Sequence, residues 1–402
     1  MNDKSKDVVI LSAVRTAQGR FQGTLKSMSA PQLGALAVRA AVERAGIEDS
    51  KQFDEVIMGN VVSAGLGQAP ARQAGIFGGV DSSVGATTIN KVCGSGLKAG
   101  MLAAQAIRAG DGQLYIAGGM ESMSRAPFLI NARNGELRYG NSELVDALKF
   151  DGLWDPFEDW IMGDAAEFIG DEYEITREAM DEYALNSHKK ALAAIDGGKF
   201  KNEIVPIEIK DRKGNTSIFD EDESPRRTTS MEALAKLKPA FKDGGKVTAG
   251  NAPGLNDGAA AMVIASREKA EALGKKPLAR IVGYAQAAVD PKHIFIAPAR
   301  AIPKLLEKVE WELKDVDLIE LNEAYAAQVL ADGYAMHELG WDWNKVNVNG
   351  GAIALGHPLG ASGARLIATL IYALKDRGLN RGIASLCLGG AEAVAMAIEI
   401  EN

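Results

Sequence analysis

The sequence predicts an α/β protein built from two similar halves that pack against each other. Three observations predict it. Strand patterns alternate with helical patterns toward both ends of the chain, the two ends share one order of motifs, and each ends in a strand followed by Gly-Gly. Alternating strands and helices favour a parallel layer. Two such halves would bring the loops at their strand ends to one shared crevice.

The N-terminal part of the chain predicts three strands and two helices. The strands fall at residues 7–14, 54–58 and 113–118, and the helices fall at 31–46 and 96–109. Gly46 is a good C-terminal signal for the first helix, and the pair Gly118-Gly119 is expected to end the third strand. The second helix is rich in small residues and apolar on nearly every face, so it should be buried.

The C-terminal part repeats this order. Helices are expected at residues 299–309 and 362–375, and strands at 316–321 and 383–388, the last one ended by Gly389-Gly390. Asn322 follows its strand as Asn60 follows the strand at 54–58. Cys93 lies 33 residues after Asn60, and His357 lies 35 residues after Asn322. This spacing indicates a duplication of one α/β half.

The middle of the chain differs from both ends. Charged residues, Trp and Tyr become common, a helix is expected near 176–195, and residues 210–230 are strongly polar. Residues 259–265 are again apolar, like the core segments of the first part, and fit either a strand or a core helix. We therefore divide the chain into an N-terminal half (residues 1–122 and 248–275), an inserted loop domain (123–247) and a C-terminal half (276–402).

Composition limits the classes of function. The chain has 402 residues and a net charge of -8, with no long basic run, which argues against nucleic acid as the main partner. Two cysteines cannot form a disulfide framework, and they favour a reducing compartment. The polar N-terminus lacks a signal-peptide pattern, and no apolar stretch is long enough to span a membrane. The sequence predicts a cytoplasmic enzyme.

The strongest chemical signal is the segment Asn90-Lys-Val-Cys93-Gly-Ser-Gly. It places a thiol in a glycine turn between a strand and a helix. A helix N-terminus stabilises a thiolate through its dipole and its free N–H groups, and the same groups can hold an oxyanion. Taken alone, the segment leaves open a buried cysteine that only packs.

A second signal is the glycine-rich loop at residues 350–363 (GGAIALGHPLGASG), which contains His357. Pro358 restricts the backbone and the glycines permit close approach, so this histidine is not placed for core packing. A thiol and a histidine together make an activated nucleophile. A structural loop histidine is the alternative. His188 and His337 lie in helical, charged surroundings and are expected at the surface.

Two further signals lie at strand ends. Cys387 ends a strand before glycines, where a second thiol could act as acid or base or could be another packing cysteine. Asn322, in Leu321-Asn322-Glu323-Ala324-Tyr325, could position a water or polarise a carbonyl, while Glu323 could cap the following helix. No metal-binding, phosphate-loop or dinucleotide motif is found, so metal, nucleotide and NAD chemistry lack support.

These blocks, in this order, resemble the thiolase family over nearly the whole chain. Further blocks that carry the resemblance are Val14-Arg15-Thr16, Met162-Gly163, residues 235–241 (AKLKPAF) and residues 248–259 (TAGNAPGLNDGA). The resemblance implies a thiolase-like fold, with the duplicated α/β halves packed as α-β-α-β-α layers and an inserted loop domain. It also implies acetyl-CoA C-acetyltransferase activity, the reversible condensation of two acetyl-CoA to acetoacetyl-CoA and coenzyme A.

The resemblance assigns the chemistry to particular residues. Cys93 would carry the acyl group, and His357 would take the thiol proton and help to hold the thioester oxygen. Asn322 would hold a water in that oxyanion site. Cys387 would take the α-proton of a second acetyl-CoA, and the N–H groups of Cys93 and Gly389 would form a second oxyanion hole. No cofactor and no metal are implied beyond the coenzyme A thioester itself.

The resemblance also implies a binding site for coenzyme A under the inserted segment. Arg226 would meet the adenine nucleotide, Met162 would border the acyl pocket, and Ala324 and Tyr325 would line the site. The pantetheine channel would be lined by Leu234, Leu237, Ala240, Phe241, Ala249 and Leu255. Ordinary core packing is the alternative for the apolar residues, and a solvated charge for Arg226. A homodimer or homotetramer is implied, with residues 125–145 as the tetramer-forming loop.

Some positions depart from the family pattern. Ile161 precedes Met162 where acetoacetyl-specific members often have His. Pro253 replaces a frequent Ser, Ala391 replaces a Gly, and residues 292–298 (KHIFIAP) are bulkier than usual. These changes bear on acyl-chain length, so the sequence also fits a broader 3-ketoacyl-CoA thiolase. A ketoacyl-synthase-type condensing enzyme, a Cys–His hydrolase and a non-catalytic acyl-CoA-binding protein fit less well. Cys387 in the second acid–base position favours the thiolase interpretation over these three.

Overall fold

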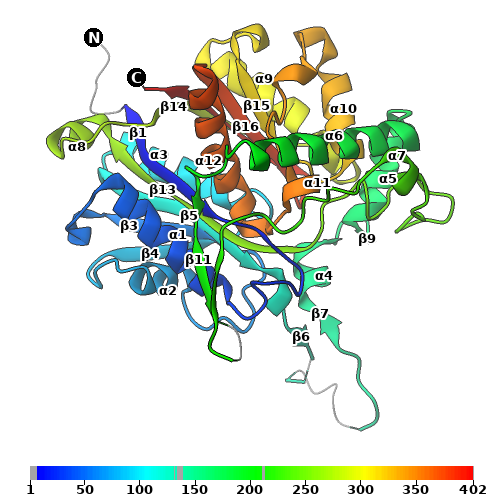
Figure 1. Cartoon of the computed structure of the whole chain (residues 1–402), viewed down its shortest axis with the longest axis horizontal. Helices are drawn as coiled ribbons and strands as arrows, with labels where there is room; N and C mark the ends of the chain where they lie inside the picture. Colours follow the sequence, from blue (N-terminus) through cyan, green and yellow to red (C-terminus); the bar gives the residue numbers. More distant parts are fainter. Residues whose placement is uncertain (1–6, 131, 134–138, 211–212, 402) are drawn as a thin grey trace.

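The structure is a computed structural model that describes residues 7–130, 132–133, 139–210 and 213–401. Two α/β halves lie side by side, and the segments of residues 128–235 extend over and away from them (Figure 1). No helix in the described ranges is long and apolar enough to cross a lipid bilayer.

The described residues contain one continuous eleven-stranded sheet, and we call its part in the N-terminal half the N-terminal sheet. The strand order of the N-terminal sheet is β1-β13-β5-β3-β4, in which β3 pairs in parallel with β4 and β5 while β13 is antiparallel to both of its neighbours. The bounds are β1 (Val8–Thr16), β3 (Glu55–Gly59), β4 (Gly85–Ile89), β5 (Leu114–Ser122) and β13 (Asn256–Ser266). The segment at residues 259–265, which fitted a strand or a helix, is therefore part of a strand.

The C-terminal half repeats this topology. Its strand order is β15-β16-β17-β14, with β15 parallel to β16 and the other pairs antiparallel. Val346 forms a parallel bridge to Ile319 of β15, where the other half has β4. The bounds are β14 (Ala279–Ala288), β15 (Leu318–Leu321), β16 (Arg381–Leu388) and β17 (Glu392–Ile400). Three residue pairs between β1 and β14 join the two sheets at one edge.

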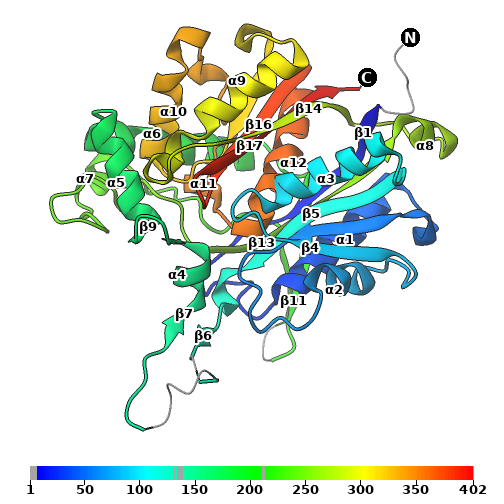
Figure 2. The same ribbon diagram turned by 180° about the vertical axis from the view of Figure 1, so that it is seen from behind.

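Two helices fill the space between the sheets. These are α3 (Ser95–Ala109) and α12 (Leu359–Arg377), whose buried residues share one core cluster with strands of both halves. Other helices cover the outer faces, which completes the five layers (Figure 2). The outer helices are α1 (Ala30–Ala45), α2 (Pro70–Phe77), α8 (Arg267–Ala272), α9 (Pro298–Val309) and α10 (Ala326–Ala335).

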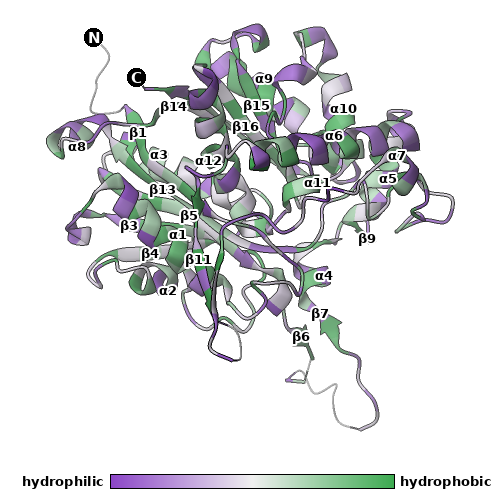
Figure 3. Ribbon diagram, viewed as in Figure 1, coloured by the Kyte–Doolittle hydropathy of each residue, from purple (hydrophilic) through white to green (hydrophobic). Residues whose placement is uncertain are grey.

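The middle of the chain forms short strands and two longer helices. Its elements are β6 (Phe128–Leu129), β7 (Val145–Asp146), α4 (Ala147–Gly152), β8 (Trp154–Asp155), β9 (Trp160–Ile161), α5 (Met162–Glu172), α6 (Arg177–Asp196), β10 (Ile204–Val205), β11 (Ile207–Lys210), β12 (Thr216–Phe219) and α7 (Met231–Ala235). The remaining elements are β2 (Gly19–Arg20) and α11 (Ala352–Leu355). Purple, hydrophilic residues lie along α6, whereas the central strands are mainly green (Figure 3).

The predicted end of the third strand is wrong. Strand β5 continues through Gly118 and Gly119 to Ser122. A Cβ atom at Gly118 would lie 2.1 Å from the Ala260 carbonyl oxygen, and one at Gly119 would lie 1.9 Å from the Gly360 carbonyl oxygen. These glycines therefore permit close packing inside a strand, and they do not end it. By contrast, β16 does end at Leu388, directly before Gly389-Gly390.

Candidate active site

One cavity of about 340 Å³ lies where the two halves meet the inserted segment. Both cysteines, His357 and Gly389 line it. The rest of the wall is mainly apolar and comes from residues 152–162, 240–255, 294–295 and 324–325. A largely apolar cavity with a few convergent polar groups has the general character of a small-molecule site.

Cys93 lies in a strained turn between β4 and α3. Val92, directly before it, has φ of 47°, a left-handed conformation that costs a β-branched residue about 1–3 kcal/mol. Hydrogen bonds hold this turn: the Val92 N–H donates to Asn90 Oδ1 at 2.9 Å, and the Ser95 hydroxyl donates to the Val92 carbonyl oxygen at 2.7 Å. The turn presents the thiol at the N-terminus of α3, as the sequence predicted.

Burial raises the pKa of the Cys93 thiol to about 12. Hydrogen bonds from the backbone N–H groups of Gly389 and of Cys93 itself act in the opposite direction and favour the thiolate, while the nearby Glu121 carboxyl adds to the rise. The resting thiol is therefore neutral at pH 7. It needs a base within reach to become a nucleophile.

His357 is fixed by hydrogen bonds to its backbone and to its ring. Its backbone N–H donates to Asn256 Oδ1 at 3.0 Å, and its Nδ1 lies 2.6 Å from the Ser362 hydroxyl oxygen. The Ser362 hydroxyl donates a hydrogen bond to the Pro358 carbonyl oxygen at 2.9 Å, so its oxygen accepts the hydrogen bond from His357 Nδ1–H. The lone pair is then on Nε2. Burial, with a smaller contribution from Arg365, lowers the pKa of His357 to about 3, so the imidazole is neutral.

Asn322 follows the end of β15 and lies fully buried behind His357. Its Nδ2 lies 3.4 Å from His357 Nε2, and an amide N–H that donates there is consistent with the lone pair on Nε2. Its Oδ1 is buried with no hydrogen-bond partner among the described residues. A buried polar atom left unpaired is rare and often marks a site for water or substrate.

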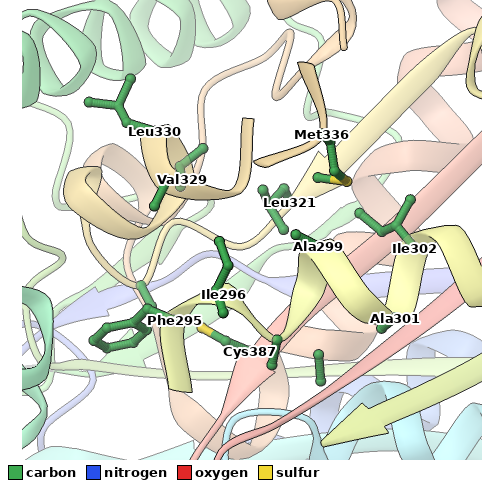
Figure 4. Close-up of a cluster of buried hydrophobic side chains, with 14 of the residues drawn as sticks. Phe295, Ile296, Ala299, Ala301, Ile302, Leu321, Val329, Leu330, Met336 and Cys387 are labelled. Carbon is green, nitrogen blue, oxygen red and sulfur yellow. The ribbon is translucent and has the colours of Figure 1, made fainter. Parts of the chain in front are cut away.

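Cys387 lies near the end of β16 and lines the cavity together with Cys93. It is 2% exposed. Burial raises its pKa well above the usual value, and the neighbouring Cys93 thiol is the next cause. Figure 4 shows its sulfur in the cluster that contains Phe295 and Ile296. Both cysteines are free thiols, so two thiols and one imidazole meet in one cavity.

Comparison with known proteins identifies the family. The N-terminal domain model of thiolase matches residues 8–268, and the C-terminal domain model matches residues 275–400. The chain belongs to the thiolase family. It is 53% identical to an acetyl-CoA acetyltransferase of Pseudomonas aeruginosa over 98% of this chain and 99% of that protein. It is 52% identical to an acetyl-CoA acetyltransferase of Escherichia coli over 99% of this chain and the full length of that protein.

A solved thiolase structure confirms the predicted fold. The crystal structure of the Bacillus anthracis acetyl-CoA acetyltransferase superposes with a TM-score of 0.94 at 47% identity. The match covers 98% of this chain and 99% of that one. The predicted family and its layered architecture of two α/β halves are thus both confirmed.

Most residues predicted to bind coenzyme A line the thiolase cavity. They are Met162, Ala240, Phe241, Ala249, Leu255, Ala324 and Tyr325. Leu234 and Leu237 lie outside it and pack around Gly250, where their methyl groups leave no room for a Cβ atom. Arg226 is exposed, and its backbone N–H donates to His188 Nδ1 at 3.2 Å. The binding roles of all these residues stay predictions.

The expectation for His188 is wrong, whereas His337 is exposed as predicted. His188 is 5% exposed on the inner side of α6, and burial lowers its pKa to about 4. A neutral ring can accept the Arg226 N–H, so His188 helps to position that loop. Charged neighbours in sequence suggested a surface residue because a helix has two faces, and its period placed His188 on the buried one.

Sequence reasoning missed Glu121 and the position of Phe295 in the cavity wall. Glu121 is buried and accepts hydrogen bonds from the backbone N–H groups of Val61, Val62 and Gly360, and burial raises its pKa to about 7. It therefore ties the helix that follows His357 to the N-terminal half. The described residues contain no cluster of three or more His, Cys, Asp or Glu that could hold a metal ion.

Proposed function

We propose that this thiolase is an acetyl-CoA C-acetyltransferase, which condenses two acetyl-CoA into acetoacetyl-CoA and coenzyme A and also catalyses the reverse thiolysis. The observation that carries the proposal is the convergence of Cys93, Cys387 and His357 on one cavity. The relatives named above support the choice of acetyl-CoA as substrate.

In the first step Cys93 becomes acylated. His357 Nε2 takes the thiol proton as Sγ attacks the thioester carbonyl. The Cys93 thiol and the His357 imidazole are both neutral at rest, so the thiol becomes a nucleophile by transferring its proton to the imidazole. The new C–S bond forms at Cys93 and the C–S bond to coenzyme A breaks. The thioester oxygen is held near His357 and Asn322, whose unpaired Oδ1 can hold a water in the same place.

Proton balance assigns a role to Cys387. His357 keeps the proton from Cys93, so the leaving sulfur of coenzyme A takes its proton from Cys387. The Cys387 thiolate then removes an α-proton from the second acetyl-CoA, and the carbanion attacks the acyl carbon on Cys93. The N–H groups of Cys93 and Gly389 hold the developing oxyanion. Cys93 leaves as a thiolate and recovers its proton from His357, which returns all three groups to their starting state.

Kinetics of both directions test the proposed function. Purified protein should release acetyl-CoA from acetoacetyl-CoA and coenzyme A, and should form acetoacetyl-CoA from acetyl-CoA when the product is removed. Inactivity in both directions would contradict the proposal. Release of CO₂ with condensation from malonyl thioesters would favour a ketoacyl-synthase type, and steady hydrolysis of acetyl-CoA without an acceptor would favour a hydrolase.

We propose a homodimer or homotetramer as the working form. Among the described residues, β4 is the last strand at one edge of the sheet and none of its residues is buried, so it offers backbone groups to a second copy. The segment that carries β6 and β7 projects from the body (Figure 1) and exposes Phe128, Ile130, Leu144 and Val145. Exposed apolar side chains of this kind mark association surfaces, and they support residues 125–145 as the tetramer-forming loop.

The cytoplasm is the proposed compartment. Catalysis needs both Cys93 and Cys387 as free thiols, and they face the same cavity. A reducing environment keeps such thiols from oxidation. Light-scattering mass measurement tests the oligomer, and cell fractionation tests the compartment.

A further inference from the structure

Three aromatic side chains from separate parts of the chain form one wall of the catalytic cavity. Tyr325 contacts Phe295 with ring centroids 5.3 Å apart and Phe241 with ring centroids 6.3 Å apart, both edge-to-face. All three line the cavity. Phe295 also lies in the same buried cluster as Cys387 (Figure 4). We call Phe241, Phe295 and Tyr325 the aromatic wall.

The hydroxyl of Tyr325 is a polar group in this otherwise apolar wall. Tyr325 lines the same cavity as Cys93 and Cys387, and in addition to burial both thiols contribute to the raised pKa of its hydroxyl, as Asp164 also does. No hydrogen bond joins this hydroxyl to another residue in the described part of the chain. Burial raises the pKa of Tyr325 far above its usual value, so the hydroxyl stays protonated. It must therefore find its hydrogen bonds in water or in a ligand.

The position of Tyr325 makes it a neighbour of any group carried by Cys93. An acyl group on Cys93 has to lie within reach of Cys387, and Tyr325 lines the cavity together with both cysteines. The pantetheine arm is expected to occupy the part of the cavity that Ala249 and Leu255 line. The remaining space is bounded by Ile161, Met162, Ile294 and the aromatic wall.

Acyl groups of different length meet this hydroxyl differently. An acetyl group is small enough to leave room for a water on the hydroxyl. A longer alkyl chain displaces that water and offers no hydrogen bond in return, which weakens binding. Phe295 contacts Tyr325 in the same wall and belongs to a buried cluster, in which rings move little, so its ring limits the length of the chain that the cavity accepts.

We propose that Tyr325, supported by Phe295, determines acyl-chain specificity and restricts Cys93 to short acyl groups. The effect is one of chain length and not of general activity. This inference rests on the proposed thiolase activity, and it goes beyond a lining role for Tyr325 because it assigns a selective function to the hydroxyl.

The test compares Tyr325→Phe with the unaltered protein on two substrates. The readout is the ratio of kcat/KM for thiolysis of 3-ketohexanoyl-CoA to that for acetoacetyl-CoA. Removal of the hydroxyl should raise this ratio about tenfold, the effect of relieving one buried unpaired hydroxyl. Phe295→Ala should raise it further with 3-ketooctanoyl-CoA, since the chain can then pass the wall.

Tyr334→Phe is the matched control. Tyr334 lies on α10, close to Tyr325 in sequence, but its ring is 48% exposed and outside the catalytic cavity. Its substitution should leave the ratio unchanged. An unchanged ratio in Tyr325→Phe would overturn the inference, and so would an equal loss on both substrates, which would place the hydroxyl in the chemistry. Failure of the unaltered protein to cleave acetoacetyl-CoA would instead overturn the proposed function.

Discussion

The two halves of the chain carry different chemistry at equivalent places of one topology. Cys93 stands two residues before α3, and His357 stands two residues before α12. Helix α3 leads into β5, which pairs in parallel with β3, and α12 leads into β16, which pairs in parallel with β15. In the proposed mechanism the N-terminal half thus presents the nucleophile where the C-terminal half presents the base, and the contact between α3 and α12 brings the two together.

A second pair of equivalent residues, Asn60 and Asn322, differs in its hydrogen bonding. Asn60 follows β3 and Asn322 follows β15, which are equivalent strands of the two halves. The Asn60 amide is fully used, since its Nδ2 donates to the Met120 carbonyl oxygen at 3.1 Å and to Glu121 at 3.0 Å. Asn322 instead points its Nδ2 at His357 and leaves its Oδ1 unpaired among the described residues.

Glu121 and Cys387 form the third equivalent pair. Gly59 pairs with Gly119 in one half and Leu321 pairs with Ser385 in the other, so Glu121 and Cys387 lie at matching positions of β5 and β16. Glu121 ties loops together with its hydrogen bonds, whereas the Cys387 thiol faces the cavity. In the proposed mechanism the N-terminal half therefore supplies the nucleophile and the supporting hydrogen bonds of Glu121, and the C-terminal half supplies the proton-transfer groups.

The largest expected effect comes from the base. His357→Asn should lower the rate of Cys93 acylation by about 10³-fold at pH 7, the usual contribution of a general base. The unaltered protein should acylate at a nearly constant rate from about pH 6 to pH 9, because neither the raised pKa of Cys93 nor the lowered pKa of His357 lies in that range.

The pH dependence of acylation in the His357→Asn variant tests whether His357 acts as the base for Cys93. Without the base, acylation depends on the thiolate fraction, so the rate of His357→Asn should rise about tenfold per pH unit. Rapid-quench measurement of acyl-enzyme against pH provides the data. An acid limb near pH 6.5 in the unaltered protein would contradict the account, since it would mean that His357 titrates near its ordinary pKa.

The two asparagines should differ in what they lose. Asn322→Ala should lower kcat about 10²-fold with little loss of stability, because its Oδ1 has no protein partner to leave unpaired among the residues described. Asn60→Ala should lower the free energy of unfolding by about 1–3 kcal/mol, because it leaves the buried Met120 carbonyl oxygen and the Glu121 carboxyl without this hydrogen-bond donor. Steady-state kinetics and urea denaturation of both variants check this. Equal effects of both substitutions on kcat would remove the functional distinction between the halves.

The close approach of α3 and α12 can be tested with two glycines of α3. A Cβ atom at Gly96 would lie 2.8 Å from the Ala364 backbone nitrogen and 3.0 Å from the Gly360 carbonyl oxygen, neither of which can move alone. At Gly100 the nearest atoms are the flexible Met262 and Met396 methyl ends, at 3.3 and 3.5 Å. Gly96→Ala should therefore lower the free energy of unfolding by about 1–3 kcal/mol.

Gly100→Ala is the matched control on the same helix. It should change stability by less than about 1 kcal/mol, since the better helix propensity of Ala offsets the displacement of two methionine ends. Urea denaturation of both variants measures the difference. Similar stabilities would mean that the helices can separate without cost, and the alignment of Cys93 with His357 would then need another explanation.

Local signals were enough to predict most elements of the two halves. The apolar strand pattern and Gly46 placed the first strand and helix within two residues, and the structure shows Gly46 in a left-handed cap with φ of 67°. Signals of this kind work because a cap or a strand period depends on neighbours in sequence. The glycines of β5 misled the prediction because Gly118 is required by a contact with Ala260 and Gly119 by a contact with Gly360, both far along the chain.

Part of the site could not be predicted for the same reason. Cys93, His357 and Cys387 stand beside glycines, so they are visible in the sequence. Glu121 lies inside an apolar strand, and its role depends on Gly360 and Asn60, which only the fold brings near. Phe295 was noted as bulky, but its position in the wall depends on a 3₁₀ turn at Pro291–Ile296.

The division of labour between the two cysteines is tested most directly by intact-mass analysis with acetyl-CoA. Cys387→Ala should gain the mass of one acetyl group, located on Cys93, yet form no acetoacetyl-CoA and incorporate no deuterium into the methyl group of acetyl-CoA in D₂O. Cys93→Ala should gain no acetyl group. Acetoacetyl-CoA formation by Cys387→Ala at the rate of the unaltered protein, or acetylation of Cys93→Ala within the cavity, would contradict the account.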